Sequence, residues 1–408
     1  MAMIRPKVLA PLALTAVTAL TLAACAGGGG GGGSGGTIVL GATLSLSGSL
    51  GVLGGPVEAG YEQAVADINK AGGISVNGTK EKVKLVVLDN GSDPNTASSQ
   101  ARELVEKDSA VALLGFTTPP IVTPTALAAE QLRVPFVTSL TPVEAFAGGD
   151  PSDTYAWDFF FDEKQQAQQA AKALATVPSN KKVVVFTDNE PDGVLERPLY
   201  KAALKADGLD VVGDYTFPVG TTDFSSFIAS AKAQGAQLMA AQMTPADGVA
   251  LWKQLKSFGF APQAAFVAKA SDAQYWWQTL GTMAQDTLSE GYWSSTGVQS
   301  AQLAKVSGTL GKKYGMTSGN MGAATMAYTA AEILAQAIGR ANSTDASKIN
   351  TAIGQTDGNF PGGHIQFSAN SHTSVTPYYV TQWQNGSEVQ VVPPVDGVTF
   401  AHPTAGLG

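Results

Sequence analysis

The sequence has a single cysteine, Cys25, and only three histidines among its 408 residues. The folded part of the chain can therefore have no disulfide framework, thiolate metal site or cysteine nucleophile. His364, His372 and His402 lack the spacing of metal ligands, and no acid accompanies them in a repeated pattern. We therefore expect no metal site, no cofactor and no enzymatic activity.

Basic residues are also few. The chain has 25 Lys and Arg against 33 Asp and Glu, a formal net charge of -8, and loss of Arg5 and Lys7 with an N-terminal signal would make it -10 (-8 - 2). Without a basic cluster, neither nucleic acid nor an anionic lipid surface is expected as a partner. The opening strand and loop also lack the G-x-G-x-x-G fingerprint of dinucleotide-binding proteins.

No later stretch has the length and apolarity of a membrane-spanning helix. The N-terminus has a basic start, an apolar run over residues 8–22 and the sequence Leu-Ala-Ala-Cys ending at Cys25. This sequence resembles the bacterial lipobox, so we predict a lipoprotein signal peptide (1–24) and a lipidated Cys25 with a Gly-rich tether (25–36). The alternative is an ordinary exported protein with a chance cysteine. The expected location is the outer face of the cytoplasmic membrane, or the periplasm.

From Thr37 onward, short β-branched runs alternate with helical patterns. The first unit is a strand from Thr37, a Ser/Gly-rich loop and a helix closed by Gly72 and Gly73. Further strands are expected at 83–88, 110–115, 134–137, 182–187, 211–217 and 237–243. This alternation predicts an α/β protein with parallel sheets covered by helices, and its restart at residue 182 predicts two similar lobes.

Three segments are expected to cross between the lobes: the aromatic run 155–161, the sequence Gly-Tyr-Trp at 291–293, and residues 363–368. The helices expected at 301–314 and 321–340 would pack on the first lobe. Such a chain leaves a cleft between the lobes, with walls built from loops at strand ends.

Several motifs, taken in order and spacing, resemble the solute-binding proteins of ABC importers, in the leucine/isoleucine/valine-binding branch. They are L-S-L-S-G at 44–48, G-Y-E-Q-A-V-A-D-I-N at 60–69, G-G-I at 72–74, Asp89 with Asp93-Pro94, V-P-F at 134–136, residues 183–188 with Gly193, and V-G-T-T-D-F at 219–224. The resemblance covers nearly all of residues 37–384. It implies a type I periplasmic binding protein fold, with two Rossmann-like lobes, parallel central sheets, three hinge crossovers and a ligand cleft between the lobes. We assign 37–157 plus 293–366 to the first lobe and 158–292 plus 367–400 to the second.

By similarity, the ligand would meet loops of both lobes. The predicted contact residues are Leu53, Thr117, Thr118, Ser139, Leu140 and Thr141 in the first lobe, and Asp192, Met243, Lys269 and Ala270 in the second. Hydroxyls could alternatively serve only as helix caps, Asp192 could be a turn residue, and Lys269 could be a solvated surface lysine.

The chain departs from relatives that bind α-amino acids. Ala270 stands where they place an acid for the ammonium, and Pro119 and Pro120 lack the backbone N–H groups that would hold a carboxylate. An ordinary α-amino acid is therefore not expected. The positive Lys269 would suit a carboxylate on an apolar or aromatic body.

The expected function is a lipid-anchored solute-binding protein outside the cytoplasm, acting as a monomer. It would deliver a small polar or carboxylate-bearing solute (amino-acid-like, an amide or an aromatic acid) to the permease subunits of an ABC importer. The alternative is a ligand-sensing receptor of the same fold that acts through a membrane signalling protein.

Overall fold

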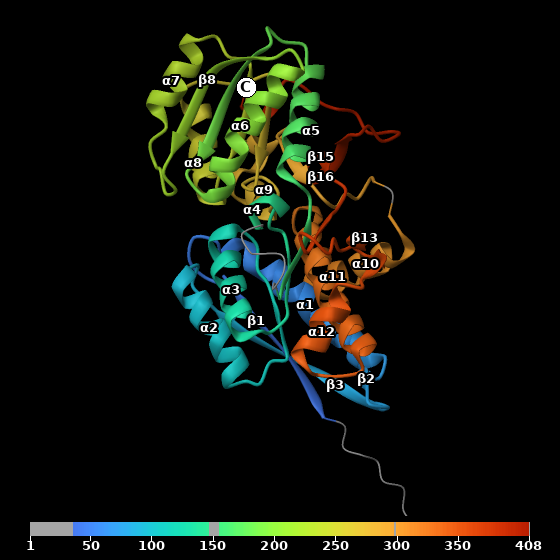
Figure 1. Ribbon diagram of the computed structural model, residues 1–408. Helices are drawn as coiled ribbons and strands as arrows, with labels where there is room; N and C mark the ends of the chain where they lie inside the picture. Colours follow the sequence, from blue (N-terminus) through green and yellow to red (C-terminus); the bar gives the residue numbers. More distant parts are fainter. Residues whose placement is uncertain (1–35, 147–154, 298, 408) are drawn as a thin grey trace, which may run out of the picture. The chain divides into compact units, whose positions relative to one another are not determined.

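Buried strands alternate with helices along the chain, and the predicted α/β architecture is confirmed (Figure 1). The computed structural model describes residues 36–146, 155–297 and 299–407. All of these belong to one unit, Gly35–Gly408. Cys25 and the predicted signal peptide lie outside the described residues, so the lipidation of Cys25 stays a prediction.

The first lobe is built on a seven-stranded sheet in which only the pair β2–β3 is antiparallel. Its order is β14 (Thr373–Val375), β6 (Ala156–Phe160), β5 (Phe136–Ser139), β4 (Ala112–Leu114), β1 (Thr37–Leu44), β3 (Thr79–Asp89) and β2 (Ile74–Val76). The central strand β1 is buried along most of its length, because helices cover both faces of a parallel sheet.

The second lobe has a seven-stranded sheet of its own, parallel except for a hairpin at one edge. Its order is β16 (Ser387–Val392), β15 (Tyr379–Gln384), β11 (Leu288–Gly291), β10 (Ala264–Ala268), β9 (Leu238–Gln242), β7 (Lys182–Asp188) and β8 (Asp210–Phe217). The short hairpin β12 (Asp357–Phe360) and β13 (Gly363–Gln366) stands apart from both sheets.

Helices surround both sheets. The first lobe has α1 (Gly54–Lys70), α2 (Pro94–Glu106), α3 (Pro119–Leu132), α4 (Val143–Phe146), α10 (Ala301–Tyr314), α11 (Ser318–Ala341) and α12 (Ala346–Ile353). The second has α5 (Glu163–Thr176), α6 (Pro191–Ala206), α7 (Ser225–Ala233), α8 (Pro245–Ser257) and α9 (Gln274–Leu280). Single 3-10 turns are η1 (Gly51–Leu53), η2 (Gly281–Ala284) and η3 (Ala405–Leu407). Figure 1 shows α1 beside α11 and α2 beside α3, and these pairs pack closely.

Two local features explain how the first lobe is assembled. The Asp93 carboxylate accepts a hydrogen bond from the Thr96 N–H at 2.7 Å and so caps the start of α2. Gly60 lets α1 approach α11 closely, since a Cβ atom there would lie only 2.2 Å from the Ala324 carbonyl oxygen. The long, Ala-rich α11 can therefore be buried against α1, as the sequence predicted for the helix at 321–340.

The chain passes between the lobes three times, as expected, but one crossing is not where the sequence placed it. The first follows β6 and the second follows β11. The third joins β14 in the first sheet to β15 in the second, so it lies at 376–378. The prediction of a crossing at 363–368 is wrong, because most of that segment pairs as β13 with β12.

The strand pairing also bears on the lobe boundaries. β14 hydrogen-bonds to β6 in the first sheet, although we assigned residues 367–400 to the second lobe. β6 itself runs past residue 157, the predicted end of the first segment of the first lobe. In both places the chain stays with the first sheet for longer than the hydrophobic pattern indicated, because a hinge strand is as buried as a core strand. The remaining boundaries stay predictions.

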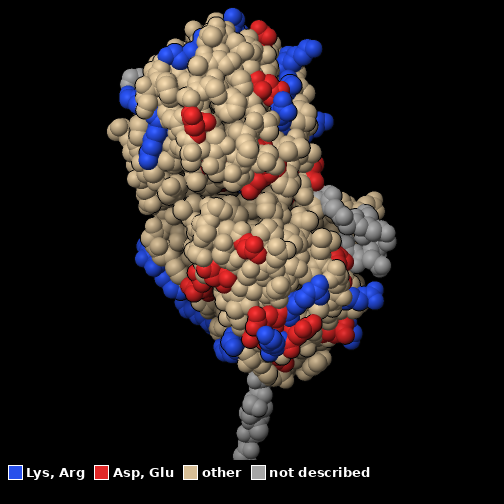
Figure 2. All heavy atoms as spheres, turned by 90° about the vertical axis from the view of Figure 1, so that its left-hand side faces the viewer, with Lys and Arg blue, Asp and Glu red and all other residues tan. Residues whose placement is uncertain are grey.

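Charged side chains are unevenly distributed over the surface. Figure 2 shows one face on which charged side chains of both signs gather toward the two ends, while the middle of the face is largely uncharged. In the part of the chain that the structure describes, every helix falls short of the length and apolarity that crossing a membrane would need.

Candidate functional site

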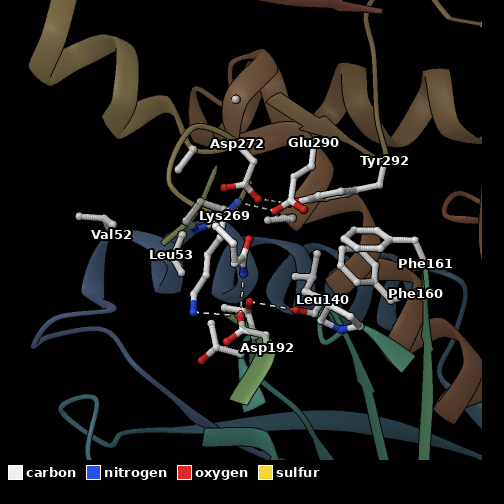
Figure 3. A pocket seen from close by; sticks show the side chains of 18 of the residues that line it. Val52, Leu53, Leu140, Phe160, Phe161, Asp192, Lys269, Asp272, Glu290 and Tyr292 are labelled. Carbon is white, nitrogen blue, oxygen red and sulfur yellow. Dashed lines mark hydrogen bonds and ion pairs between the residues drawn. The ribbon is translucent and has the colours of Figure 1, made fainter. Parts of the chain in front are cut away.

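A cavity of about 50 Å³ lies between the lobes, at the carboxyl ends of strands from both sheets (Figure 3). Its lining residues come from three sources. The first lobe contributes Val52, Leu53, Pro56, Thr117, Thr118, Leu140, Pro142, Gly319, Asn320 and Ala323; the second contributes Asp192, Glu196, Gln242, Lys269, Asp272, Ala273 and Glu290; and the strand ends and crossings contribute Phe160, Phe161 and Tyr292. The cleft predicted between the lobes is thus a small space that residues of both lobes line.

The wall from the first lobe is uncharged. Leu53 and Leu140 give it apolar surface, and two threonines give it hydroxyls. The Thr117 hydroxyl donates a hydrogen bond to the Leu140 carbonyl at 3.1 Å, which ties two of the loops together. The buried Thr118 hydroxyl has no hydrogen-bond partner among the described residues. It therefore remains available to a ligand.

Helix α3 begins at this wall, but it lacks the free backbone N–H groups with which the first turn of a helix usually binds an anion. Its first two residues are Pro119 and Pro120, which have no N–H, and the next two amides, of Ile121 and Val122, both donate to the Thr118 carbonyl. The Thr118 side chain makes no capping hydrogen bond. This rules out the capping alternative for Thr118 and leaves the helix end without a free amide among its first four residues.

Three non-glycine residues of the cavity have left-handed backbone conformations. The φ angles are 71° at Thr118, 68° at Leu140 and 62° at Lys269. Such conformations are disfavoured for residues with a Cβ atom, most of all for a β-branched threonine, and they cluster at functional sites. Here they turn two loops of the first lobe and one of the second toward the same space.

The wall from the second lobe is dominated by charge. Lys269 follows β10, is 6% exposed, and its ammonium pairs with the carboxylates of Glu190 and Asp192, the latter at 3.0 Å. Gln242 also donates to Asp192, at 2.9 Å. Burial lowers the pKa of Lys269, but the charges of Asp192, Asp188 and Glu190 outweigh it and hold that pKa above its usual value. Lys269 therefore stays charged.

The acidic residues beside Lys269 lie close enough to suggest a cation site. One oxygen from each of Asp188, Glu190 and Asp192 lies within 4.8 Å of the others. The Lys269 ammonium already stands among them as the cation. Burial raises the pKa of Asp188 to about 7, against the opposing effect of Lys269.

A second group of acids lies in the same wall, where Figure 3 shows Asp272 and Glu290 beside Tyr292. The Tyr292 hydroxyl donates to Asp272 at 3.0 Å, and the Lys269 backbone N–H donates to Glu290 at 2.8 Å. Burial raises the pKa of Asp272 to about 6 and that of Glu290 well above its usual range, and a hydrogen bond joins the two carboxyl groups. Two adjacent buried carboxyl groups can be accommodated when they share a proton.

Aromatic rings close the cavity at the crossings. Phe160 and Tyr292 meet edge to face, with ring centroids 4.9 Å apart, and Phe161 meets Tyr378 in the same way at 4.7 Å. Phe161, Tyr292 and Tyr378 belong to the three different crossings. The aromatic run was predicted at a crossing, and these rings also line or support the cavity.

Six of the ten predicted contact residues are brought together at the cavity: Leu53, Thr117, Thr118, Leu140, Asp192 and Lys269. The other four are not. Ser139 and Thr141 are buried on either side of Leu140, which takes the place at the cavity. Met243 and Ala270 lie in the hydrophobic core of the second lobe. Gln242 and Lys269 line the cavity, whereas the residues that follow them, Met243 and Ala270, pack into that core.

The prediction for Lys269 needs two corrections. It is not a solvated surface lysine, because it is almost completely buried. Nor is its ammonium fully available to a ligand carboxylate, because Glu190 and Asp192 take two of its three N–H donors. The expectation that the second lobe lacks an acid for a ligand cation is also wrong, since Glu196, Asp272 and Glu290 all line the cavity.

One of these missed acids had a signal in the sequence. Glu196 is four residues after Asp192, and this spacing puts both on one face of α6. Asp272 and Glu290 had no comparable signal. They come from segments 18 residues apart (290 - 272), and only the packing of the loop after β10 against the end of β11 joins them.

Comparison with known proteins finds relatives along most of the chain. The family model described as periplasmic binding protein matches residues 37–388. The Leu/Ile/Val-binding protein homolog 3 of Brucella melitensis is 27% identical over 366 residues, which cover 86% of this chain and 93% of the relative. Homolog 7 of the same organism is 26% identical over 386 residues, covering 87% and 91%.

Solved structures share the fold. A branched-chain amino acid transporter substrate binding protein of Streptococcus pneumoniae, in complex with isoleucine, superposes with a TM-score of 0.75 at 22% identity, covering 87% of this chain and 99% of that one. A solute binding protein of an ABC transporter from R. palustris, in complex with benzoate, gives 0.73 at 17% identity, covering 87% and 95%.

Proposed function

Because the chain belongs to the periplasmic binding protein family, we propose that it captures a small solute between its two lobes and delivers it to an ABC importer. It is a binding protein, as its relatives are, and not an enzyme. The cavity is the observation on which the proposal rests, since each lobe supplies one wall and the crossings supply the end.

The mechanism follows from this construction. A solute that touches both walls stabilises the closed arrangement over an open one, and the permease recognises the closed pair of lobes. The aromatic contacts among the crossings give the hinge a packed centre about which the lobes turn.

The geometry narrows the classes of solute expected from the sequence. Related structures hold isoleucine and benzoate, so amino acids and aromatic acids are the starting candidates. The walls of this cavity favour a solute with N–H donors, amino-acid-like or amide, because carboxyl groups line the second lobe and the only lysine lining the cavity is already paired. An aromatic acid would bring its carboxylate against those acids.

Tethering at the membrane is part of the same proposal. Cys25 would carry the lipid after signal cleavage, and the Gly-rich segment that follows it would let a monomer reach the permease. Globomycin, which blocks lipoprotein signal cleavage, should make the protein accumulate with its signal attached, and Cys25→Ser should release it from the membrane fraction.

X-ray scattering tests the mechanism directly. Solutes that co-purify with the full chain are identified by mass spectrometry, removed by dialysis under mild denaturant, and added back. The radius of gyration should fall when a bound solute is restored. A solute that binds without any such change would contradict closure between the lobes.

Gene deletion then separates delivery from sensing. Deletion should abolish uptake of that solute if the protein serves an importer. Intact uptake together with lost gene induction would instead identify the sensing receptor.

A further inference from the structure

More carboxyl groups line the cavity than the single amino group of Lys269 can neutralise. Four carboxyl groups line it, from Asp192, Glu196, Asp272 and Glu290, against one amino group, that of Lys269. Lys269 is engaged with Glu190 and Asp192, and its backbone N–H is engaged with Glu290. Glu196, Asp272 and Glu290 therefore have no cationic side chain of their own among the lining residues.

Glu196 is the most exceptional of these acids. It is 1% exposed, and the Tyr200 hydroxyl, which has one proton to donate, is the only hydrogen-bond partner of its two carboxylate oxygens among the described residues. Burial, with the charges of Asp192 and Glu290, raises its pKa well above the usual range, and the Tyr200 hydrogen bond opposes this only in part. Buried polar groups are almost always paired, so a buried carboxyl group that lines a cavity with at least one oxygen unpaired indicates a missing partner.

The neighbouring side-chain amides do not supply that further partner. The Gln166 amide, the nearest donor group of α5, is directed to Glu290 and to the Tyr200 hydroxyl, at 3.2 Å each. The Gln242 amide is directed to Asp192. Both amides thus serve other atoms, and the further partner of Glu196 must come from the cavity itself.

The remaining walls suit a cation with an organic body. Phe160, Phe161 and Tyr292 line the cavity at the crossings, and aromatic faces attract cations. The volume of about 50 Å³ is small beside the cavity of about 150 Å³ that holds benzene in a protein core. The occupant of this closed form is therefore compact.

We propose that the solute is a compact organic cation, an amidinium, guanidinium or small alkylammonium ion without a carboxylate, and that Glu196 is its counter-ion. This inference rests on the proposed function, capture between the lobes, and replaces the amino-acid-like and amide solutes considered there with a cation. The first wall agrees with it, because α3 has no free amide for a carboxylate within its first turn. The cation would stabilise the ionised form of Glu196, so binding near neutral pH should release a proton.

Three probes of nearly one shape test the charge requirement: acetamidinium, acetamide and acetate, which are cationic, neutral and anionic. Each is titrated into the full chain by calorimetry, with guanidinium and urea as a second matched pair. We expect acetamidinium to bind at least tenfold more tightly than acetamide, a difference of about 1.4 kcal/mol, and acetate not to bind. Titration in two buffers of different protonation enthalpy should show release of up to about one proton per cation.

Glu196→Gln locates the effect. Glutamine keeps the shape of the side chain and cannot be ionised, so the variant should fold, lose most of the preference for acetamidinium and lose the proton release. Glu332→Gln on α11 is the matched control, because Glu332 is also partly buried with a raised pKa but is bonded to Gln302 outside the cavity. It should leave both quantities unchanged.

Acetamide or acetate binding as tightly as acetamidinium would overturn the inference, as would no binding of any of the cations at about 10 mM, a concentration at which even weak sites fill. An unchanged preference in Glu196→Gln would overturn the role of that residue. Failure of this inference can be distinguished from failure of the proposed function. If a neutral or anionic solute from the cell still closes the lobes in scattering, the protein remains a solute receptor with a different ligand.

Discussion

The two walls of the cavity differ in charge. The first lobe contributes apolar side chains and hydroxyls held by strained loops, whereas the second contributes buried acids arranged around one lysine. Both walls stand at the carboxyl ends of strands in sheets of the same size. Two lobes of similar architecture can thus present quite different chemistry, because the fold sets where a wall lies and the loop residues set what it binds.

The difference has a consequence for stability. A neutral wall costs little to bury, but ionised groups lose their hydration and must be paired or protonated. The charged wall should therefore be where substitution and pH affect the protein most.

The largest effect is expected at Lys269. Lys269→Met removes the cation shared by Glu190 and Asp192 and leaves both acids beside Asp188 without it. Loss of one partner of a buried ion pair typically costs about 3–5 kcal/mol. Urea unfolding monitored by tryptophan fluorescence should show a decrease of that size in the free energy of unfolding.

Lys201→Met is the control, because Lys201 makes an ion pair at the surface with Asp214, which keeps Arg197 as a second partner. It should cost less than about 1 kcal/mol. Equal costs for the two substitutions would mean that the charged wall is no more dependent on its cation than the surface is.

A smaller effect is expected from pH. Burial raises the pKa of Asp272 to about 6 and that of Asp188 to about 7. The folded protein therefore holds protons on these two groups that the unfolded chain releases near pH 4, so they should make stability fall as pH rises from about 4 to 7. The groups facing Asp272 do not reverse this sign, since burial also raises the pKa values of Glu290 and Glu388, and Lys269 stays charged throughout.

Asp272→Asn should reduce that fall by about 1–3 kcal/mol, since one carboxyl group no longer ionises. Urea unfolding at intervals between pH 4 and 8 measures the change. Asp223→Asn is the control, because Asp223 is exposed and its pKa is lowered by hydrogen bonds from Ser225, outside this pH range. A slope that Asp272→Asn leaves intact would show that this residue does not titrate as described.

The sequence predicted the fold and part of the first wall. Strand and helix periods are local, so the alternation that gives two sheets could be seen directly, whereas Leu53, Thr117 and Thr118 were implied by the resemblance to a family. The resemblance to a family then fixed the order of the loops. Leu140 was placed correctly, while its neighbours Ser139 and Thr141 were not, because a pattern places a loop more reliably than it directs a side chain.

The second wall depended on contacts that no local pattern reveals. Whether Lys269 is exposed or buried is decided by Glu190 and Asp192, more than seventy residues earlier in the chain. Glu290 lies near the end of β11 and looks like any polar residue after a hydrophobic run. Its role follows only from the approach of β11 to β10 and of α5 from the other side.

The smallest change in stability is expected for substitutions in the first wall. Whether stability rises or falls is what this experiment tests. Thr118→Gly would relieve a left-handed conformation at φ 71° and remove a buried hydroxyl without a partner, gains that exceed the loss of a methyl contact and the added entropy of the unfolded chain. We expect an increase in stability of up to about 1 kcal/mol. Thr117→Gly should instead decrease it by about 1 kcal/mol, because Thr117 loses its hydrogen bond to Leu140 and has no left-handed backbone to relieve.

The same two variants also test whether the strained backbone at Thr118 contributes to solute binding. If the free Thr118 hydroxyl meets the solute, Thr118→Gly should bind it more weakly even though the folded protein is more stable, as calorimetry with the identified solute would show. A variant that gains stability and keeps full affinity would mean that the unusual backbone at Thr118 only shapes the loop, and that recognition lies almost wholly in the acidic wall.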